Sequence, residues 1–130
     1  MNKISNAIIL AAGLGERLKP ITEEIPKCMT EVNGISILEN ALKVLSNNDI
    51  KKTVIVIGYL GEKIIDAFKE QYGDMKIIYR WNNDYTTTNS MYSLWLARDF
   101  LEEGTYLIEG DVFFSSTFFE MVQQLRVDKS

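Results

Sequence analysis

The residue types best suited to chemistry gather in residues 10–27, directly after the first apolar run of the chain. The glycines Gly13 and Gly15 let the backbone approach a bulky anion and turn its N–H groups toward phosphate oxygens. Arg17 offers a planar guanidinium for phosphate, and Lys27 a compact charge that can meet the same anion from another side. This spacing favours a phosphate-binding loop, and the alternative is a plain glycine turn with solvated basic side chains.

A carboxylate follows another apolar run, in the sequence Glu109-Gly110-Asp111. Gly110 permits a sharp exit from a strand, so Asp111 is expected to project where that strand ends. An oxygen ligand there suits Mg²⁺, which commonly takes one or two carboxylates and completes its shell with phosphates and water. Asp111 is therefore the candidate metal ligand, with Glu109 as a second candidate. The alternative is an ordinary acidic turn at a strand end.

A third cluster consists of short polar side chains in residues 82–94, just before and within a helical pattern. Thr88, Asn89 and Ser90 lie where that helix is expected to begin. Such groups at a helix N-terminus can contact the edge of a base or hold a phosphate. The alternative is a polar capping segment that only starts the helix.

The pattern of apolar residues predicts the scaffold that must position these clusters. Four strands are expected, at residues 7–11, 53–57, 76–79 and 105–108. Strands that alternate with helices predict an α/β fold with a three-layer αβα, Rossmann-like, mostly parallel sheet. Ligands of such sheets sit beyond the carboxyl ends of the strands, so the three clusters are expected to meet at that edge.

Each expected helix has its own start signal and apolar face. The first is capped by Ser36 and Glu39 and buries Leu38, Ala41, Leu42 and Leu45, and the second follows Gly61 and carries Ile64, Ile65 and Phe68. The third is capped by Asn89 or Ser90, with Met91, Leu94, Trp95 and Arg98 on one side, and the fourth is opened by Ser116, with Phe118, Val122 and Leu125 aligned.

Composition limits the partners and the chemistry. The chain has 130 residues and a net charge of −4 without a basic run, so one domain over residues 1–130 and no nucleic-acid partner are expected. The apolar run at residues 7–12 is too short to span a membrane, so no membrane partner is expected. The single cysteine, Cys28, is interpreted as a small packed hydrophobe in a protein of the cytoplasm. The sequence has no histidine, which excludes Ser-His-Asp and Cys-His nucleophiles and histidine-ligated metals.

Two common phosphate-binding motifs do not fit the glycine-containing segment. A dinucleotide fingerprint needs a glycine where Leu18 stands and an acid where Gly58 ends the second strand. A P-loop needs Gly-Lys-Ser/Thr, which the chain does not contain. The segment instead resembles the nucleotidyltransferase family that makes nucleoside-diphosphate sugars and related activated head groups. The positions that carry the resemblance are Leu10, Ala12, Gly13, Gly15, Arg17, Leu18, Pro20, Pro26 and Lys27.

The resemblance implies the nucleotide-diphospho-sugar transferase fold and a role for each matched residue. The backbone at Ala12 and Gly13 would contact base and ribose, Gly15 and Arg17 would hold the triphosphate, and Lys27 would contact the phosphates during transfer. Asp111 would bind the magnesium ion that the nucleotide carries, so Arg17, Lys27 and Asp111 are the expected catalytic residues. The full nucleotide-binding set expected is Leu10, Ala11, Ala12, Gly13, Gly15, Glu16, Arg17, Lys27, Thr88, Asn89 and Ser90.

The segment around Thr88 and Asn89 is similar to the phosphocholine cytidylyltransferase branch of that family, through Thr88-Asn89 followed by Tyr92, Ser93 and Leu94. This implies Mg²⁺-dependent transfer of CMP from CTP to a small phosphorylated acceptor, phosphocholine-like or 2-aminoethylphosphonate, with release of pyrophosphate. A sugar-1-phosphate nucleotidylyltransferase and a non-catalytic nucleotide-binding module are the alternatives. Family members are about twice this long, so the chain is expected to be an N-terminal half with an unpaired sheet edge that could form a homodimer.

Four aromatic residues in the same part of the chain allow two interpretations. Trp81, Tyr85, Tyr92 and Trp95 either line a cation–π site for a quaternary ammonium or pack in the core. Core packing is at least as strong an expectation for Trp95, which lies within the third helical pattern.

Overall fold

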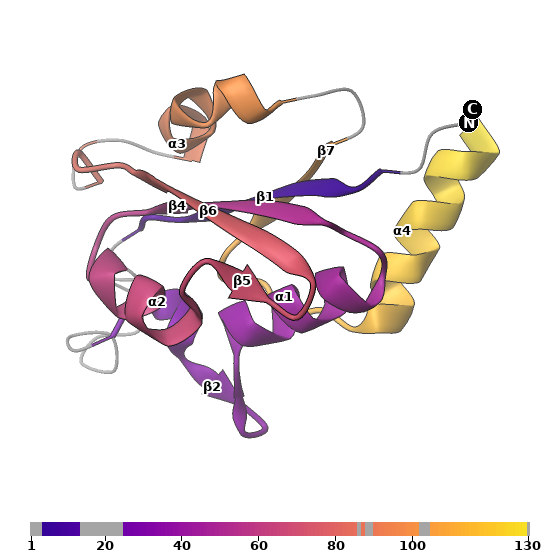
Figure 1. Ribbon diagram of the computed structural model, residues 1–130, viewed down its shortest axis with the longest axis horizontal. Helices are drawn as coiled ribbons and strands as arrows, with labels where there is room; N and C mark the ends of the chain where they lie inside the picture. Colours follow the sequence, from indigo (N-terminus) through magenta and orange to yellow (C-terminus); the bar gives the residue numbers. More distant parts are fainter. Residues whose placement is uncertain (1–3, 14–24, 86, 88–89, 102–104, 130) are drawn as a thin grey trace.

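The centre of the molecule is a five-stranded sheet with the order β5-β6-β4-β1-β7 (Figure 1). The computed structural model describes residues 4–13, 25–85, 87, 90–101 and 105–129. The strands of this sheet are β1 (Asn6–Ala11), β4 (Lys52–Ile57), β5 (Gln71–Tyr72), β6 (Met75–Trp81) and β7 (Thr105–Glu109). β1 pairs in parallel with both β4 and β7, β4 pairs in parallel with β6, and the short β5 pairs antiparallel with β6. The four predicted strands and the mostly parallel sheet are therefore confirmed.

Helices cover both faces of the sheet, which gives the predicted three layers. α1 (Ile37–Asn47) and α2 (Gly61–Phe68) lie on one face, and α3 (Ser90–Leu96) lies on the other (Figure 1). α4 (Ser116–Lys129) follows β7, and two short 3₁₀ turns, η3 (Lys27–Met29) and η4 (Arg98–Phe100), complete the helical elements described. None of the described helices is long and apolar enough to cross a membrane.

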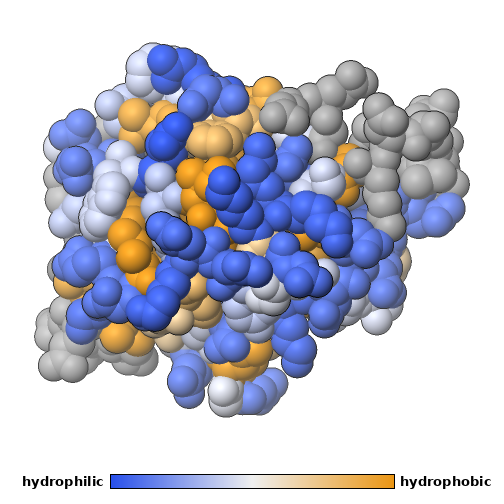
Figure 2. All heavy atoms as spheres, viewed as in Figure 1, coloured by the Kyte–Doolittle hydropathy of each residue, from blue (hydrophilic) through white to orange (hydrophobic). Residues whose placement is uncertain are grey.

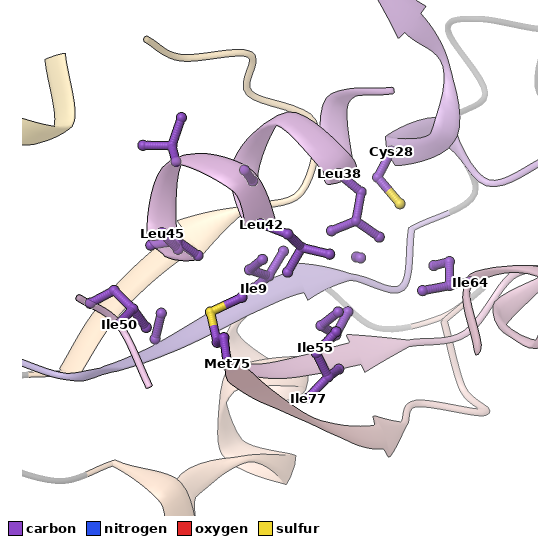
Figure 3. Close-up of a cluster of buried hydrophobic side chains, with 14 of the residues drawn as sticks. Ile9, Cys28, Leu38, Leu42, Leu45, Ile50, Ile55, Ile64, Met75 and Ile77 are labelled. Atoms are coloured by element: carbon purple, nitrogen blue, oxygen red, sulfur yellow. The ribbon is translucent and has the colours of Figure 1, made fainter. Parts of the chain in front are cut away.

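The larger part of the core lies between the sheet and α1. Ile9, Ile55 and Ile77 point from neighbouring strands toward Leu42 and Leu38 of α1 (Figure 3). At the start of α1 the Ser36 hydroxyl accepts a hydrogen bond from the Glu39 backbone N–H at 3.0 Å, as the capping pattern predicts. In the view of Figure 1, the outer surface carries mostly polar side chains with smaller apolar areas between them (Figure 2).

A smaller core lies on the opposite face, under α3 and η4. Ile8 and Leu10 of β1 and Val54 and Val56 of β4 are buried there against Ala97. Residues of β1 thus alternate between the two cores, which is why the strand reads as a continuous apolar run.

The predicted apolar side of the third helix is wrong. Met91 and Trp95 are 69% and 53% exposed, while Ser93 and Ala97 are buried. The physical cause is polar: the buried Asn82 side chain donates from Nδ2 to Ser93 Oγ at 3.1 Å, which turns Ser93 toward the sheet. Met91 and Trp95 consequently face outward, since they lie on the other side of the same helix.

The fourth helix begins at Ser116, as predicted, but its buried aromatic residue is displaced by one position. Ser115 caps this helix, because its hydroxyl accepts from the Phe118 N–H at 3.0 Å. Phe119 is buried against Phe114 and Tyr106, whereas Phe118 is 56% exposed. Val122 is half-buried, and the side chain of Leu125 lies outside the described part.

Three small strands were not predicted from the sequence: β5 at the edge of the main sheet and a separate pair, β2 and β3. β2 (Glu31–Val32) and β3 (Ile35–Ser36) form an antiparallel hairpin that leads into α1. The turn between them, Asn33-Gly34, has positive φ values of 56° and 86°, the backbone that an Asn-Gly pair favours in a tight hairpin.

Candidate functional site

The strand order places a ligand crevice where β1 lies between β4 and β7. α1 and α2, which follow β1 and β4, lie on one face, whereas α3, which precedes β7, lies on the other. The crossovers on the two sides of β1 thus cover opposite faces of the sheet, and ligands of parallel sheets bind at such a point, beyond the carboxyl ends of the strands, here β1 and β7. The residues that follow these two strands are Ala12 and Gly13 after β1 and Gly110 and Asp111 after β7.

Lys27 and Asp111, two of the residues expected to be catalytic, meet at this edge. Lys27 Nζ lies 2.9 Å from Asp111 Oδ2, in an ion pair between residues 84 positions apart in the sequence. Their side chains remain 29% and 44% exposed, so both charges are open to an incoming ligand. The fold thus joins the lysine after the glycine-containing segment to the carboxylate at the end of the fourth predicted strand.

Gly110 fixes the segment that carries Asp111 against the end of β1. Its N–H donates to the Leu10 carbonyl at 2.8 Å, and a Cβ at this position would lie 2.7 Å from the same oxygen. Because that separation is shorter than a real Cβ contact, the close approach of the two strand ends requires glycine. Farther along, Asn40 of α1 donates from Nδ2 to the Phe114 carbonyl at 2.7 Å and holds the same segment.

The backbone after β1 behaves differently at Ala12 and at Gly13. The Ala12 carbonyl accepts from the Tyr59 N–H at 3.3 Å, which continues the contact between the ends of β1 and β4. At Gly13 an added Cβ would meet nothing within 4 Å, so no packing of the described residues demands glycine there. Leu10, Ala11 and Ala12 are buried, so their side chains are not open to a ligand.

Lys27 owes its position to the turn that follows Pro26. The adjacent Cys28 is buried between η3 and α1, beside Leu38 (Figure 3). The pKa of the Cys28 thiol is raised to about 12, mainly by burial and also by repulsion of the thiolate from the nearby Asp111 carboxylate, against a lowering by a backbone hydrogen bond. A neutral, packed thiol agrees with the prediction that Cys28 acts as a small hydrophobe, and it anchors the turn from which Lys27 extends.

The polar segment before α3 is organised by Asn82, to which the sequence reasoning gave no role. Besides its bond to Ser93, Asn82 accepts at Oδ1 from the Asp84 N–H at 3.0 Å. Its own N–H donates to the Ile57 carbonyl at 2.7 Å, which ties the segment to the end of β4. An Asn whose side chain bonds to the N–H two residues on is the signature of an Asx turn, and this signal could have identified it.

The remaining predicted nucleotide-binding residues can be placed only in part. Ser90 begins α3, at the N-terminus where the polar cluster was expected. Gly15, Glu16, Arg17, Thr88 and Asn89 lie outside the described residues.

The aromatic residues form pairs rather than one enclosed site. Tyr85 packs edge-on against Tyr59, with ring centroids 6.0 Å apart. Tyr92 stacks on Trp95, whose ring also lies 3.6 Å below the Arg98 guanidinium. The prediction that Trp95 packs in the core is therefore wrong, because its ring is exposed and stacks against other side chains on the surface.

The acidic residues fit a magnesium ion held mainly by its substrate. Within the residues that the structure describes, no group of three or more His, Cys, Asp or Glu side chains could hold a metal ion. Asp111 supplies an accessible carboxylate at the crevice, Glu109 is exposed at the end of β7, and Mg²⁺ commonly binds through one or two carboxylates plus substrate phosphates. The donor set therefore suits a nucleotide-borne ion rather than an all-protein metal site.

Comparison with known proteins gives a family match and several similar sequences. The model of the nucleotidyl transferase family matches residues 6–130. Choline-phosphate cytidylyltransferase of Haemophilus influenzae is 42% identical over 114 residues, which cover 88% of this chain and 47% of that protein. 2-Aminoethylphosphonate cytidylyltransferase of Lancefieldella rimae is 35% identical over 112 residues, which cover 85% of this chain and 44% of that protein.

The chain also resembles a solved structure in its fold. CTP:phosphocholine cytidylyltransferase from Streptococcus pneumoniae matches with a TM-score of 0.72 and 39% identity. The match covers 83% of this chain and 46% of that one. The chain thus spans just under half of the length of these relatives.

Proposed function

The chain belongs to the nucleotidyl transferase family, and from that premise we propose that its protein transfers CMP from CTP to a small phosphorylated acceptor. The acceptor is a phosphocholine-like or 2-aminoethylphosphonate molecule, and pyrophosphate is the second product. The choice of CTP follows the relatives that act on choline phosphate and 2-aminoethylphosphonate, which match over more than four-fifths of this chain.

The observation that carries this proposal is the ion pair between Lys27 and Asp111. The two side chains are opposite in charge, partly exposed, and located where β1 and β7 end. A nucleoside triphosphate with its magnesium ion carries both a negative and a positive charge, and each can interact with one member of such a pair. Its phosphates attract the Lys27 ammonium, and its metal ion attracts the Asp111 carboxylate.

The reaction would proceed by in-line substitution at the α-phosphorus of CTP. An anionic oxygen of the acceptor phosphate or phosphonate attacks that phosphorus, and the bond to the β-phosphate oxygen breaks to release pyrophosphate. Since the nucleophile is already an anion, no general base is needed, which agrees with a chain that has no histidine. Catalysis then depends on alignment and on stabilisation of the developing negative charge.

Each candidate residue has a defined part in that stabilisation. Lys27 neutralises charge on the phosphates, Arg17 holds the triphosphate, and Asp111 positions the nucleotide through its metal ion. Bound Mg²⁺ would supply Lewis-acid stabilisation of the phosphate oxygens. Before nucleotide binds, the ion pair keeps the Lys27 and Asp111 side chains together at the crevice, so nucleotide binding exchanges one set of charge partners for another.

Gly13 supplies a second argument, because its surroundings leave room for a side chain. The Cβ of an alanine would fit without contact, in contrast to Gly110, where it would meet the Leu10 carbonyl. A ligand whose base and ribose pass over the backbone at Gly13 would occupy that open space. Glycine at this position is then a requirement of the nucleotide complex rather than of the fold.

A pyrophosphate-release assay on the longest available form of the polypeptide tests the proposal. CTP and UTP are each combined with Mg²⁺ and with phosphocholine, 2-aminoethylphosphonate or glucose 1-phosphate. The expected result is release that requires Mg²⁺, CTP and one of the two amino-alcohol-type acceptors. Release only with UTP and glucose 1-phosphate would overturn the proposed substrates. Tight CTP binding without release from any pair would instead indicate a nucleotide-binding module.

A further inference from the structure

A cavity of about 330 Å³, whose lining includes neither Lys27 nor Asp111, lies on the face of the sheet that α1 and α2 cover. Its walls come from the end of η3, the β2–β3 hairpin, the start of α1, the end of α2 and β5. The volume is within the range of small-molecule sites, which begin at about 300 Å³. None of its lining residues belongs to the predicted nucleotide-binding set.

Among the described residues, the charged groups that line this cavity are carboxylates. Glu31 of β2 and Glu39 of α1 reach it from two elements, and the described lining residues include no lysine or arginine. The uncharged part of the wall includes the rings of Phe68 and Tyr72 and the thioether of Met29. A site of this composition attracts a cation and repels a phosphate.

Tyr72 and Glu39 show how the acidic and aromatic parts of the wall are joined. The Tyr72 hydroxyl donates to Glu39 Oε2 at 3.4 Å, so the ring edge and the carboxylate sit on the same side of the cavity. A tyrosine hydroxyl is protonated at neutral pH and can donate, and burial together with the Glu39 charge raises the pKa of Tyr72 further. The carboxylate has acceptor capacity beyond this one bond.

The mixture of carboxylates and aromatic rings distinguishes between kinds of cation. A hard metal ion such as Ca²⁺ needs six to eight oxygen ligands, and half of this wall is apolar. An organic ammonium uses both parts, since its charge pairs with a carboxylate while its methyl or methylene groups pack on ring faces. We propose that this cavity is a second binding site, which takes a small organic cation, a primary or quaternary ammonium.

Titration of the 130-residue chain with tetramethylammonium and with ethylammonium, in the absence of nucleotide, tests this site. Binding is followed by ¹H–¹⁵N NMR through the backbone amides of Gly34 and Gln71, both of which line the cavity. Saturable shifts of these amides are expected, at least tenfold weaker in affinity in the double variant Glu31→Gln/Glu39→Gln. Glu62→Gln, an exposed carboxylate of α2 outside the cavity, is the matched control and should bind like the wild type.

Three outcomes would overturn the second site. These are the absence of saturation, equal binding by the double variant, and equal shifts on adding the same concentration of NaCl, which would indicate only a screened surface charge. If the double variant does not fold, Glu31→Gln alone replaces it, because Glu31 is exposed and its loss leaves the Tyr72–Glu39 bond intact. As no nucleotide is present, failure here leaves the proposed transfer reaction unaffected.

Discussion

Two ion pairs of the molecule have nearly the same geometry and very different surroundings. Lys27 and Asp111 are 2.9 Å apart, and Arg80 and Asp99 are 3.0 Å apart, with all four side chains at least partly exposed. The first pair joins two segments at the carboxyl ends of parallel strands. The second joins β6 to η4 across 19 residues and lies beside Phe100, whose ring is 4.6 Å from the Arg80 guanidinium.

The comparison shows that an ion pair is informative through its place in the topology rather than through its distance. An exposed pair contributes only about 0–1 kcal/mol to stability, so neither is needed to hold the fold. The Arg80–Asp99 pair links β6 to η4 on the α3 side of the molecule and contributes a small amount to stability there. Lys27–Asp111 lies at the crevice, where its charges can exchange the partner they have for a ligand. The variants below separate these two roles.

Removal of the acidic partner should give the largest difference between the pairs. Asp111→Asn is expected to reduce Mg²⁺-dependent pyrophosphate release about 10²–10³-fold, the usual effect of losing one charge-stabilising contact in a transition state. Asp99→Asn, the matched change in the other pair, should leave the rate within about twofold. Both variants should keep the circular dichroism spectrum of the wild type. Equal rates in the two variants would remove the distinction between the pairs.

Removal of the basic partner extends the comparison to the side chains of Lys27 and Arg80. Lys27→Met keeps the length and apolar stem of the side chain and should reduce kcat for pyrophosphate release by about 10²-fold, because the phosphates lose a positive contact. Arg80→Met serves as the control and is expected to retain wild-type kcat with a slightly lower melting temperature. If Arg80→Met were the slower enzyme, the crevice would have been assigned to the wrong strands of the sheet.

Substitutions of the two glycines near the crevice should have smaller effects, one on CTP binding and the other on stability. Gly13→Ala should leave the free energy of unfolding within about 0.5 kcal/mol of the wild type, as expected away from packed features, yet raise the KM for CTP by about tenfold. Gly110→Ala should lower the free energy of unfolding measurably, because its Cβ would meet the Leu10 carbonyl at 2.7 Å. Urea unfolding and CTP saturation curves measure both quantities. A destabilised Gly13→Ala with normal KM would contradict a ligand at that position.

The smallest effect concerns pH and the Arg80–Asp99 pair. The hydrogen bond from Arg80 holds the pKa of Asp99 below its usual value of 3.8. A carboxyl with a lowered folded-state pKa stabilises the protein above pH 3.8, and this stabilisation disappears as the pH falls through the folded-state pKa. The wild type should therefore be slightly more stable than Asp99→Asn at pH 5, and the difference should shrink as the pH falls below 3.8 and through the lower folded-state pKa. Urea midpoints of both proteins at several pH values provide the test.

The sequence predicted the fold and the meeting of Lys27 with Asp111 for the same reason. Continuous apolar runs mark strands buried on both faces, and parallel strands bring their carboxyl ends to one edge. Residues that follow the first and fourth predicted strands were therefore expected together, and the 2.9 Å pair agrees with that expectation.

The features that the sequence did not predict depend on contacts between distant residues. Helical periodicity gave the spacing of Met91 and Trp95, but the bond from Asn82 to Ser93 decides which side of α3 is buried. In α4, packing against Tyr106 and Phe114 selects Phe119 rather than its neighbour. The cavity between the β2–β3 hairpin and α2 arises from several elements together, so no local pattern marks it. The Asn33-Gly34 pair is an exception, because an Asn-Gly pair indicates a tight hairpin turn and could have predicted β2 and β3 from the sequence.

The measurement that tests the central claim most directly is a crystal structure of the protein with CTP and Mg²⁺. The account predicts a metal ion about 2.1 Å from an Asp111 carboxylate oxygen, the usual Mg²⁺–oxygen distance. Lys27 should have left Asp111 for a phosphate oxygen, and the nucleoside should pass over the backbone at Gly13. A nucleotide bound elsewhere, with the Lys27–Asp111 contact unchanged, would contradict it.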